Sequence, residues 1–389
     1  MELLIYLILF LLVLIVSSTT NKLLPFLPLP LVQILLGIVI GLFLPNTDFH
    51  LNTELFLALV IGPLLFRESE EADITAILKH WRIIVYLIFP VIFISTLSLG
   101  GLAHLLWLSL PLAACLAVGA ALGPTDLVAF ASLSERFSFP KRVSNILKGE
   151  GLLNDASGLV AFQVALTAWT TGAFSLGQAS SSLIFSILGG FLIGVLTAMT
   201  NRFLHSFLLS VRATDIASEL LLELSLPLVT FFLAEEVHVS GIIAVVVAGI
   251  LKASRFKKIT LLEAQVDTVT ETVWHTVNFM LNGSVFVILG MELEMIAEPI
   301  LTNPIYNPLL LLVSIIALTF VLFAIRFVMI YGYYAYRTRR LKKKLNKYMK
   351  DMLLLTFSGV KGTVSIATIL LIPSDLEQEY PLLLFLVAG

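Results

Sequence analysis

The amino-acid sequence predicts an all-α protein that crosses a lipid bilayer many times. Of its 389 residues, 58% are hydrophobic and only 13% are charged, and the mean hydropathy is +1.00. Soluble domains carry about 25% charged residues, so water is not the main solvent of this chain. Apolar runs separated by polar loops recur along the whole sequence, which is the pattern of a polytopic helical membrane protein.

Thirteen apolar stretches are predicted to be transmembrane helices. They lie at 2–18, 29–45, 52–66, 83–108, 110–133, 144–170, 181–200, 215–233, 237–251, 273–291, 306–335, 351–373 and 380–389. The first has no basic start and no small-residue cleavage site, so it is predicted to be a retained span. A helix needs about 20 residues to cross the hydrocarbon core, so we expect the last stretch to be a truncated final helix.

The basic residues give these spans an orientation. All but two of the 24 Lys and Arg residues lie in or beside odd-numbered loops, whereas even-numbered loops such as 46–52 and 170–180 hold none. The positive-inside rule therefore places the odd loops in the cytoplasm of a cell-membrane protein and the N-terminus outside. The net charge of −2 argues against a nucleic-acid partner, and the basic block 337–350 is predicted to be a loop.

Two spans carry breaks at matching positions. Gly123-Pro124-Thr125-Asp126 interrupts span 5 and 358–362, which includes Lys361, interrupts span 12. Each is the fifth of six spans, so spans 1–6 and 8–13 are predicted to form an inverted repeat with crossed discontinuous helices 5 and 12. Such breaks expose helix ends at the midplane, where Asp126 and Lys361 would compensate the helix dipoles.

Span 6 brings further polar residues to the same depth. Helical spacing puts residues 151, 154, 155 and 158 on one face, so Asn154 and Asp155 can lie beside Asp126. A buried carboxylate can hold either a small cation or a proton, and competition between them is exchange. The alternative for either Asp is a buried carboxylate that its neighbours satisfy.

Arg326 lies inside span 11 and needs an acidic partner at that depth. Glu150 is the best candidate, and the pair would be structural; the alternative is an Arg326 side chain that extends to the membrane surface. The six histidines show no metal-ligand spacing, so no resident metal and no cofactor are predicted. Glu219 and Glu223 share a face of span 8 and are interpreted as facing protein rather than lining an entrance.

Several motifs together resemble the monovalent cation:proton antiporters of the NhaP/NHE type, the sodium/hydrogen exchanger family. The resemblance covers most of the chain. The motifs are Thr125-Asp126, the run from Lys148 to Asp155, Ser240-Gly241-Ile242-Ile243-Ala244 with Ala248-Gly249, the set Trp274, Asn278, Asn282, Phe286 and Gly290, and Gly359-Val360-Lys361-Gly362.

This resemblance implies a homodimer that works by elevator-type alternating access. It implies interface helices 1–3 at 1–68, core helices 4–6 at 80–170, linking helix 7 and interface helices 8–10 at 178–292, and core helices 11–13 at 305–389. It implies ion and proton binding at Asp155, with Thr125, Asp126 and Asn154 lining the site and Glu150 paired with Arg326. The Asn-Asp pair implies electroneutral exchange of Na⁺ or Li⁺ for H⁺.

The sequence departs from the family pattern in four places. Gly151 stands where the signature has Ser, Leu127 follows Thr-Asp in place of Pro, and Lys361 replaces Arg. In span 3, Arg67 follows Phe66 and the acidic Glu68 comes next, so Glu68 is kept as a possible gate or ligand.

Other functions remain open alternatives. The nearest is a K⁺/H⁺ antiporter with the same mechanism. A cation channel fits paired broken helices less well than a moving site does. An intramembrane aspartyl protease would use Asp126 and Asp155, but Asp155 follows Asn rather than the Gly-x-Gly expected there. The protein is therefore predicted to be a transporter and not an enzyme.

Overall fold

The described part of the chain is helical. The computed structural model describes residues 2–24, 26–43, 53–125, 139–171, 176–211, 215–253, 261–302, 307–340, 342 and 345–358. These residues contain helices and no strand, which confirms the helical class. Each apolar stretch from 2–18 to 351–373 contains helix, and 380–389 lies outside the described residues.

Five of the described helices are long and apolar enough to cross a membrane. They are Trp81–Leu106, Ile184–Ser210, Ile216–Glu236, Thr268–Glu294 and Pro308–Arg340. Four shorter apolar helices are Ile8–Leu23, Leu29–Leu42, Leu112–Ala121 and Gly241–Ala253. Multiple passes through a bilayer are thus consistent with the described helices, whereas the number of thirteen spans stays a prediction.

The chain divides into two compact units. The first comprises residues 1–48, 75–174 and 285–389, and the second comprises 49–74 and 175–284. The first contains α1 (Glu2–Leu23), α2 (Leu29–Phe43), α5 (Ile74–Leu78), α6 (Trp81–Tyr86), the π-helical turn η2 (Leu87–Val91), α7 (Ile92–Leu106), α8 (Leu112–Ala121), α10 (Lys141–Thr171), α15 (Pro308–Arg340), the 3-10 turn η3 (Leu345–Tyr348) and α16 (Met349–Phe357). The second contains α3 (Thr53–Phe56), the π-helical turn η1 (Leu57–Ile61), α4 (Gly62–Glu70), α11 (Leu176–Ser210), α12 (Ile216–Glu236) and α13 (Gly241–Ala253). Helix α14 (Leu261–Thr302) contributes its start to the second unit and its end to the first. The division into interface and core helices stays a prediction.

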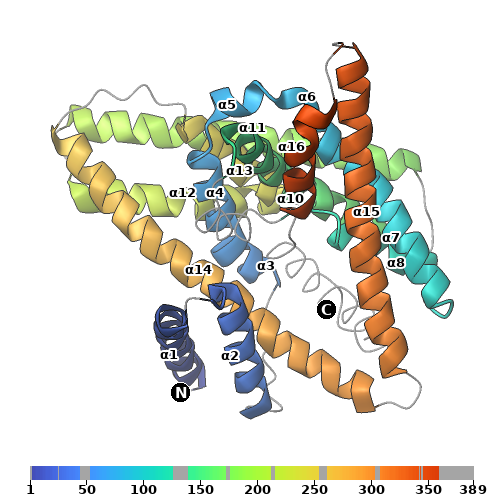
Figure 1. The fold of residues 1–389 in the computed structure, drawn as a ribbon. Coiled ribbons are helices and arrows are strands. Elements are labelled where there is room, and N and C mark those ends of the chain that lie inside the picture. The colour runs from blue at the N-terminus through green and yellow to red at the C-terminus, as the bar shows by residue number, and fades with distance from the viewer. Residues whose placement is uncertain are drawn as a thin grey trace. The chain divides into compact units, whose positions relative to one another are not determined.

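Helices α7, α8, α10 and α15 form the core of the first unit. Helix α7 packs against both α8 and α15, as Figure 1 shows. Small residues permit the closest approach, because a Cβ atom on Gly100 of α7 would lie 2.8 Å from the Cα atom of Leu116 in α8. Phe162 of α10 and Leu318 of α15 pack into the same buried cluster. The core thus holds α10 and α15 in fixed positions.

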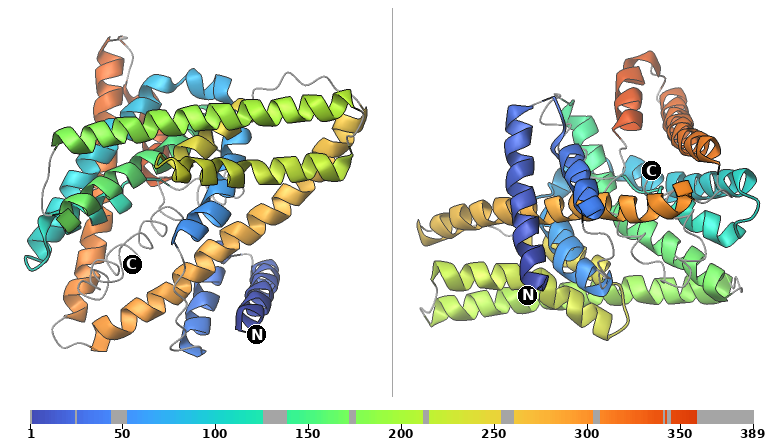
Figure 2. Two further views of the ribbon diagram at one scale, coloured as in Figure 1. Left: turned by 180° about the vertical axis from the view of Figure 1, so that it is seen from behind. Right: turned by 90° about the horizontal axis from the view of Figure 1, so that it is seen from below.

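Helix α13 is largely buried and packs against α4, α11 and α12. Figure 2 shows α11 and α12 lying side by side along their length. A Cβ atom on Gly194 of α11 would overlap the carbonyl oxygen of Ala244 in α13, so only glycine admits this approach. At the start of α12, the Asp215 carboxylate caps the helix by accepting a hydrogen bond from the Ser218 amide at 2.8 Å.

Candidate functional site

The first predicted helix break lies at the end of α8. The helix stops at Ala121, and the chain is no longer helical from Leu122 to Thr125. Pro124 has no amide hydrogen to continue the helix. Its ring lies against Gly158 of α10, where any Cβ atom would overlap it. The end of α8 therefore rests directly on the polar face of α10.

Thr125 and Asn154 meet at this point. The Asn154 amide nitrogen donates a hydrogen bond to the Thr125 hydroxyl at 3.1 Å, and both side chains are buried, with exposed fractions of 1% and 3%. The Asn154 side-chain oxygen is buried too and finds no hydrogen-bond donor among the described residues. A buried acceptor without a donor is costly, so this oxygen is suited to bind a cation.

The side chains of three predicted site residues lie outside the described part of the chain. Asp155 belongs to helix α10, but its side chain lies outside the described residues. Asp126 and Lys361 lie wholly outside them. The structure thus brings together Thr125 and Asn154 from the predicted lining set, and the second break is described only up to Ser358, just after α16 ends.

Glu150 and Arg326 form a bidentate ion pair close to this site. Arg326 Nη1 donates to Glu150 Oε1 at 2.7 Å and Nη2 donates to Oε2 at 2.8 Å. Arg326 Nε also donates to the carbonyl oxygen of Leu355 in α16 at 2.9 Å. With both side chains buried, the pair joins α10, α15 and α16 and keeps Glu150 occupied.

A second ionic cluster lies in the second unit, and the sequence reasoning missed it. Lys252 Nζ lies 2.7 Å from Glu223 Oε2 and 3.7 Å from Glu70 Oε1. Trp274 Nε1 donates to Glu223 Oε1 at 3.0 Å. Burial raises the pKa of Glu70, at the loop end of α4, while Lys252 lowers it. Lys252 counts as a loop cation in the sequence, and only the fold shows that it is 8% exposed.

Two acidic residues singled out in the sequence, Glu68 and Glu219, lie on the same helices as this cluster. Arg67 pairs with Glu70 at 2.9 Å and with Glu71 at 2.7 Å, at the helical spacings i+3 and i+4. Glu68 directly follows Arg67 in α4 and is partly buried. Its role as a gate or ligand stays a prediction. Glu219 lies 3.2 Å from His205, so both glutamates of span 8 contact protein side chains, as interpreted from the sequence.

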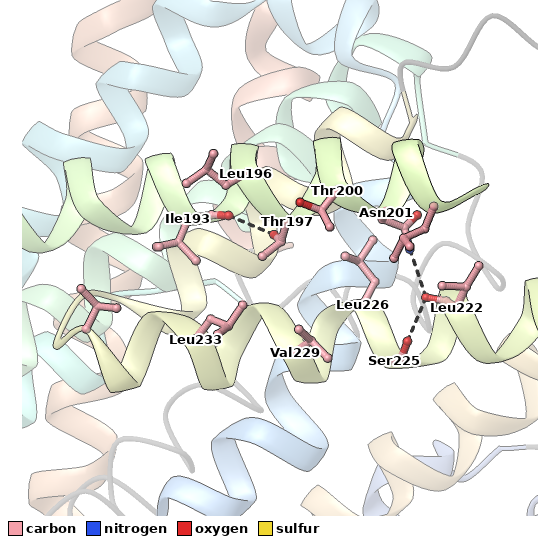
Figure 3. A pocket seen from close by; sticks show the side chains of 12 residues that line it. Ile193, Leu196, Thr197, Thr200, Asn201, Leu222, Ser225, Leu226, Val229 and Leu233 are labelled. Carbon is pink, nitrogen blue, oxygen red and sulfur yellow. Dashed lines mark hydrogen bonds between the residues drawn. The ribbon is translucent and has the colours of Figure 1, made fainter. Parts of the chain in front are cut away.

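A hollow of about 290 Å³ lies between α11 and α12 (Figure 3). Its walls are mainly leucine, isoleucine and valine side chains. Three of its four polar side chains are bonded to backbone carbonyls, since Thr197 donates to Ile193, and Asn201 and Ser225 both donate to Leu222. This hollow therefore offers an ion few available ligands.

Apolar helices of spanning length, a helix that ends at a buried polar site and a buried guanidinium are features shared by multi-pass membrane transporters. Comparison with known proteins makes this assignment specific. Residues 7–388 match the family described as sodium/hydrogen exchanger, transmembrane, and the chain belongs to this family. The resemblance to antiporters of the NhaP/NHE type is thereby confirmed.

Two bacterial relatives carry the name sodium, potassium, lithium and rubidium/H(+) antiporter. The chain is 36% identical over 391 residues to the protein from Bacillus pumilus (strain SAFR-032) and 36% identical over 382 residues to that from Bacillus subtilis (strain 168). These matches cover 98% and 96% of this chain but only 58% and 57% of the relatives' own length. Both are transporters rather than enzymes, as expected from the sequence.

A solved structure has the same fold. The sodium proton antiporter MjNhaP1 from Methanocaldococcus jannaschii superimposes with a TM-score of 0.70 over 100% of this chain and 94% of its own, at 19% sequence identity. The antiporter fold is thus established for this chain, although few residues are shared.

Proposed function

We propose that the protein exchanges Na⁺ or Li⁺ for H⁺ across the cell membrane, one for one, at a site formed by Asp155, Asp126, Asn154 and Thr125. The observation that carries this proposal is the buried Asn154 oxygen, which lacks a donor among the described residues, next to the Thr125 hydroxyl. Hard oxygen ligands of this kind suit a small monovalent cation. Family membership supports the same activity.

In this proposal Asp155 carries the exchange. Glu150 is fully engaged by Arg326, which leaves Asp155 as the carboxylate of α10 that can release a proton when a cation binds. A single titrating carboxylate couples one proton to one monovalent cation, so the exchange is electroneutral. Burial has to raise the pKa of this Asp toward neutral pH, since an unperturbed Asp titrates at about 3.9.

Potassium is the second candidate ion. The printed names of the two Bacillus relatives include potassium and rubidium beside sodium and lithium. Larger ions need a wider site, and Gly151 in place of the serine of the family signature leaves more room on this face of α10. A K⁺/H⁺ antiporter with the same mechanism is therefore the alternative.

We also propose the architecture that the sequence predicts. It has thirteen spans in an inverted repeat, an N-terminus outside, odd-numbered loops in the cytoplasm and crossed broken helices 5 and 12, with Lys361 compensating the second break. Two such chains form a homodimer, and the core helices move against the interface helices in an elevator-type transition. The end of α8 at Ala121 supports a break in span 5.

Everted membrane vesicles that contain the full-length protein test the function. A preformed pH gradient should dissipate on addition of Na⁺ or Li⁺, and Asp155→Asn should abolish this response. Repeating the assay with K⁺ and valinomycin to clamp the voltage should leave the rate unchanged if exchange is electroneutral. A response to K⁺ alone selects the alternative ion, and undiminished exchange by Asp155→Asn would refute the site.

A further inference from the structure

A second hollow, of about 720 Å³, lies in the first unit between the start of α6 and the end of α15. Four basic side chains line it: Lys79, Arg82, Arg337 and Arg340. Tyr333, which lines the hollow, has its ring 5.1 Å from that of Tyr86 at the end of α6, and the Tyr86 hydroxyl donates to the Met329 carbonyl oxygen of α15 at 3.2 Å. The hollow is therefore built between two packed helices rather than in a loose loop.

These four cations differ from Arg326 and Arg142, the two basic side chains of this unit for which the described residues show an ion pair. Arg326 pairs with Glu150 and Arg142 pairs with Asp351, whereas the ion pairs found in the described part of the chain include none of the four. No carboxylate is among the residues that line the hollow. Four like charges around one space repel each other, and a bound anion would remove that repulsion.

Aromatic and apolar side chains lead from the hollow along both helices. On the span that begins with α6, the exposed Trp81, Val85 and Phe89 are spaced by four residues and so share one face. On α15, the exposed Tyr336 and Val328 share a face with Gly332, where a Cβ atom would meet no other atom within 4 Å. Trp and Tyr at the ends of apolar spans mark the level of the lipid headgroups.

We propose that this hollow binds an anionic phospholipid of the membrane leaflet at this end of the spans. Its phosphate lies among Lys79, Arg82, Arg337 and Arg340, and its acyl chains run along the Trp81–Phe89 and Tyr336–Val328 faces. Basic pockets between transmembrane helices on the cytoplasmic side are typical sites for such headgroups. Because the apolar faces continue from the basic hollow, a lipid fits the surface better than a soluble anion does.

Thermal unfolding of the purified full-length protein in detergent tests this site. Added dioleoyl-phosphatidylglycerol should raise the melting temperature more than dioleoyl-phosphatidylcholine does. In the Arg337→Gln/Arg340→Gln variant, the phosphatidylglycerol concentration for half the shift should rise roughly twenty-five-fold, at about five-fold for each charge removed. The matched control is Lys141→Gln/Arg339→Gln, which removes two exposed charges that do not line the hollow and should keep the wild-type response.

Two further measurements separate the outcomes. Brominated phosphatidylglycerol should quench tryptophan fluorescence more than brominated phosphatidylcholine does, and Trp81→Phe should remove this difference. This measurement does not use the double variant, so it tests the site even if that variant folds poorly. The proposal is overturned by equal shifts in the hollow and control variants, by equal effects of the two lipids, or by persistence of the quenching difference in Trp81→Phe. It is also overturned if glycerol-3-phosphate reproduces the full shift, because a soluble anion would then be the ligand.

Discussion

Glu150 and Arg326 are 176 residues apart in the sequence and form an ion pair with two parallel hydrogen bonds of 2.7 and 2.8 Å. The third guanidinium contact, from Nε to the Leu355 carbonyl oxygen, extends the connection to α16. The planar guanidinium of arginine can donate two parallel hydrogen bonds to one carboxylate, whereas the ammonium group of lysine cannot. The pair therefore fixes the helix that carries Asn154 and Asp155 against two helices from the end of the chain.

Removing either partner of this pair should be more harmful than removing both. Glu150→Gln or Arg326→Met alone leaves a buried charged or polar group without its partner and should lower the free energy of unfolding by about 3–5 kcal/mol. The double variant leaves no buried charge and should recover part of this loss. Thermal unfolding of the four proteins in one detergent gives the comparison, and additive losses in the double variant would contradict the coupling.

Asn154 should matter for cation affinity beyond its structural role. Asn154→Ala removes the buried oxygen and the bond to Thr125, so we expect the half-saturating Na⁺ concentration in the vesicle assay to rise about ten-fold, which corresponds to about 1.4 kcal/mol. Ser157→Ala is the control, since that hydroxyl donates only to the Asn154 backbone carbonyl. An unchanged half-saturating concentration in Asn154→Ala would remove this oxygen from the site.

In the ionic cluster of the second unit, a buried charge should contribute more to stability than an exposed one. Lys252→Met leaves Glu70 and Glu223 without their shared cation and should lower the free energy of unfolding by about 3 kcal/mol. Glu71→Gln removes a carboxylate that is 59% exposed and should cost less than about 1 kcal/mol. Melting temperatures of the two variants, measured side by side, give the ranking; an equal loss would contradict it.

Glu70 should make stability depend on pH. Its pKa is raised by burial above the ordinary value of 4.5, so the folded protein binds this proton more tightly than the unfolded chain. This contribution is fully present below the ordinary pKa and is lost as pH rises through the raised one. The melting temperature of wild type relative to Glu70→Gln should therefore fall as pH increases from 4.5. A difference that grows with pH would mean that the pKa is lowered instead.

Two alanine substitutions should have opposite effects. Gly194→Ala places a methyl group on the Ala244 carbonyl of α13 and should destabilise by about 1–3 kcal/mol. Gly101→Ala in α7 meets no atom within 4 Å and should stabilise by up to about 1 kcal/mol, because alanine favours helix. Melting temperatures should separate in these directions, and the same sign for both would show that close helix approach does not decide the outcome.

Local patterns were sufficient for the helical class, for the end of α8 and for the pairing of Glu150 with Arg326. Runs of apolar residues near 20 in length have few structures other than a spanning helix, since lipid offers no hydrogen bonds to an open backbone. Pro124 ends a helix by its own covalent geometry, and α8 does stop three residues before it. Arg326 had to find an acidic group at membrane depth, and the number of candidates was small.

Only the tertiary structure decided which distant groups meet. The positive-inside rule grouped Lys252, Arg337 and Arg340 together as loop cations, because it counts charges and not their neighbours. The fold buries Lys252 between two glutamates, whereas it leaves Arg337 and Arg340 around an open basic hollow. Partner choice of this kind depends on helix packing, which the small residues at Gly100 and Gly194 permit but do not specify. The sequence by itself thus determined a helical membrane protein of the sodium/hydrogen exchanger family, and packing decided which of its charges are paired.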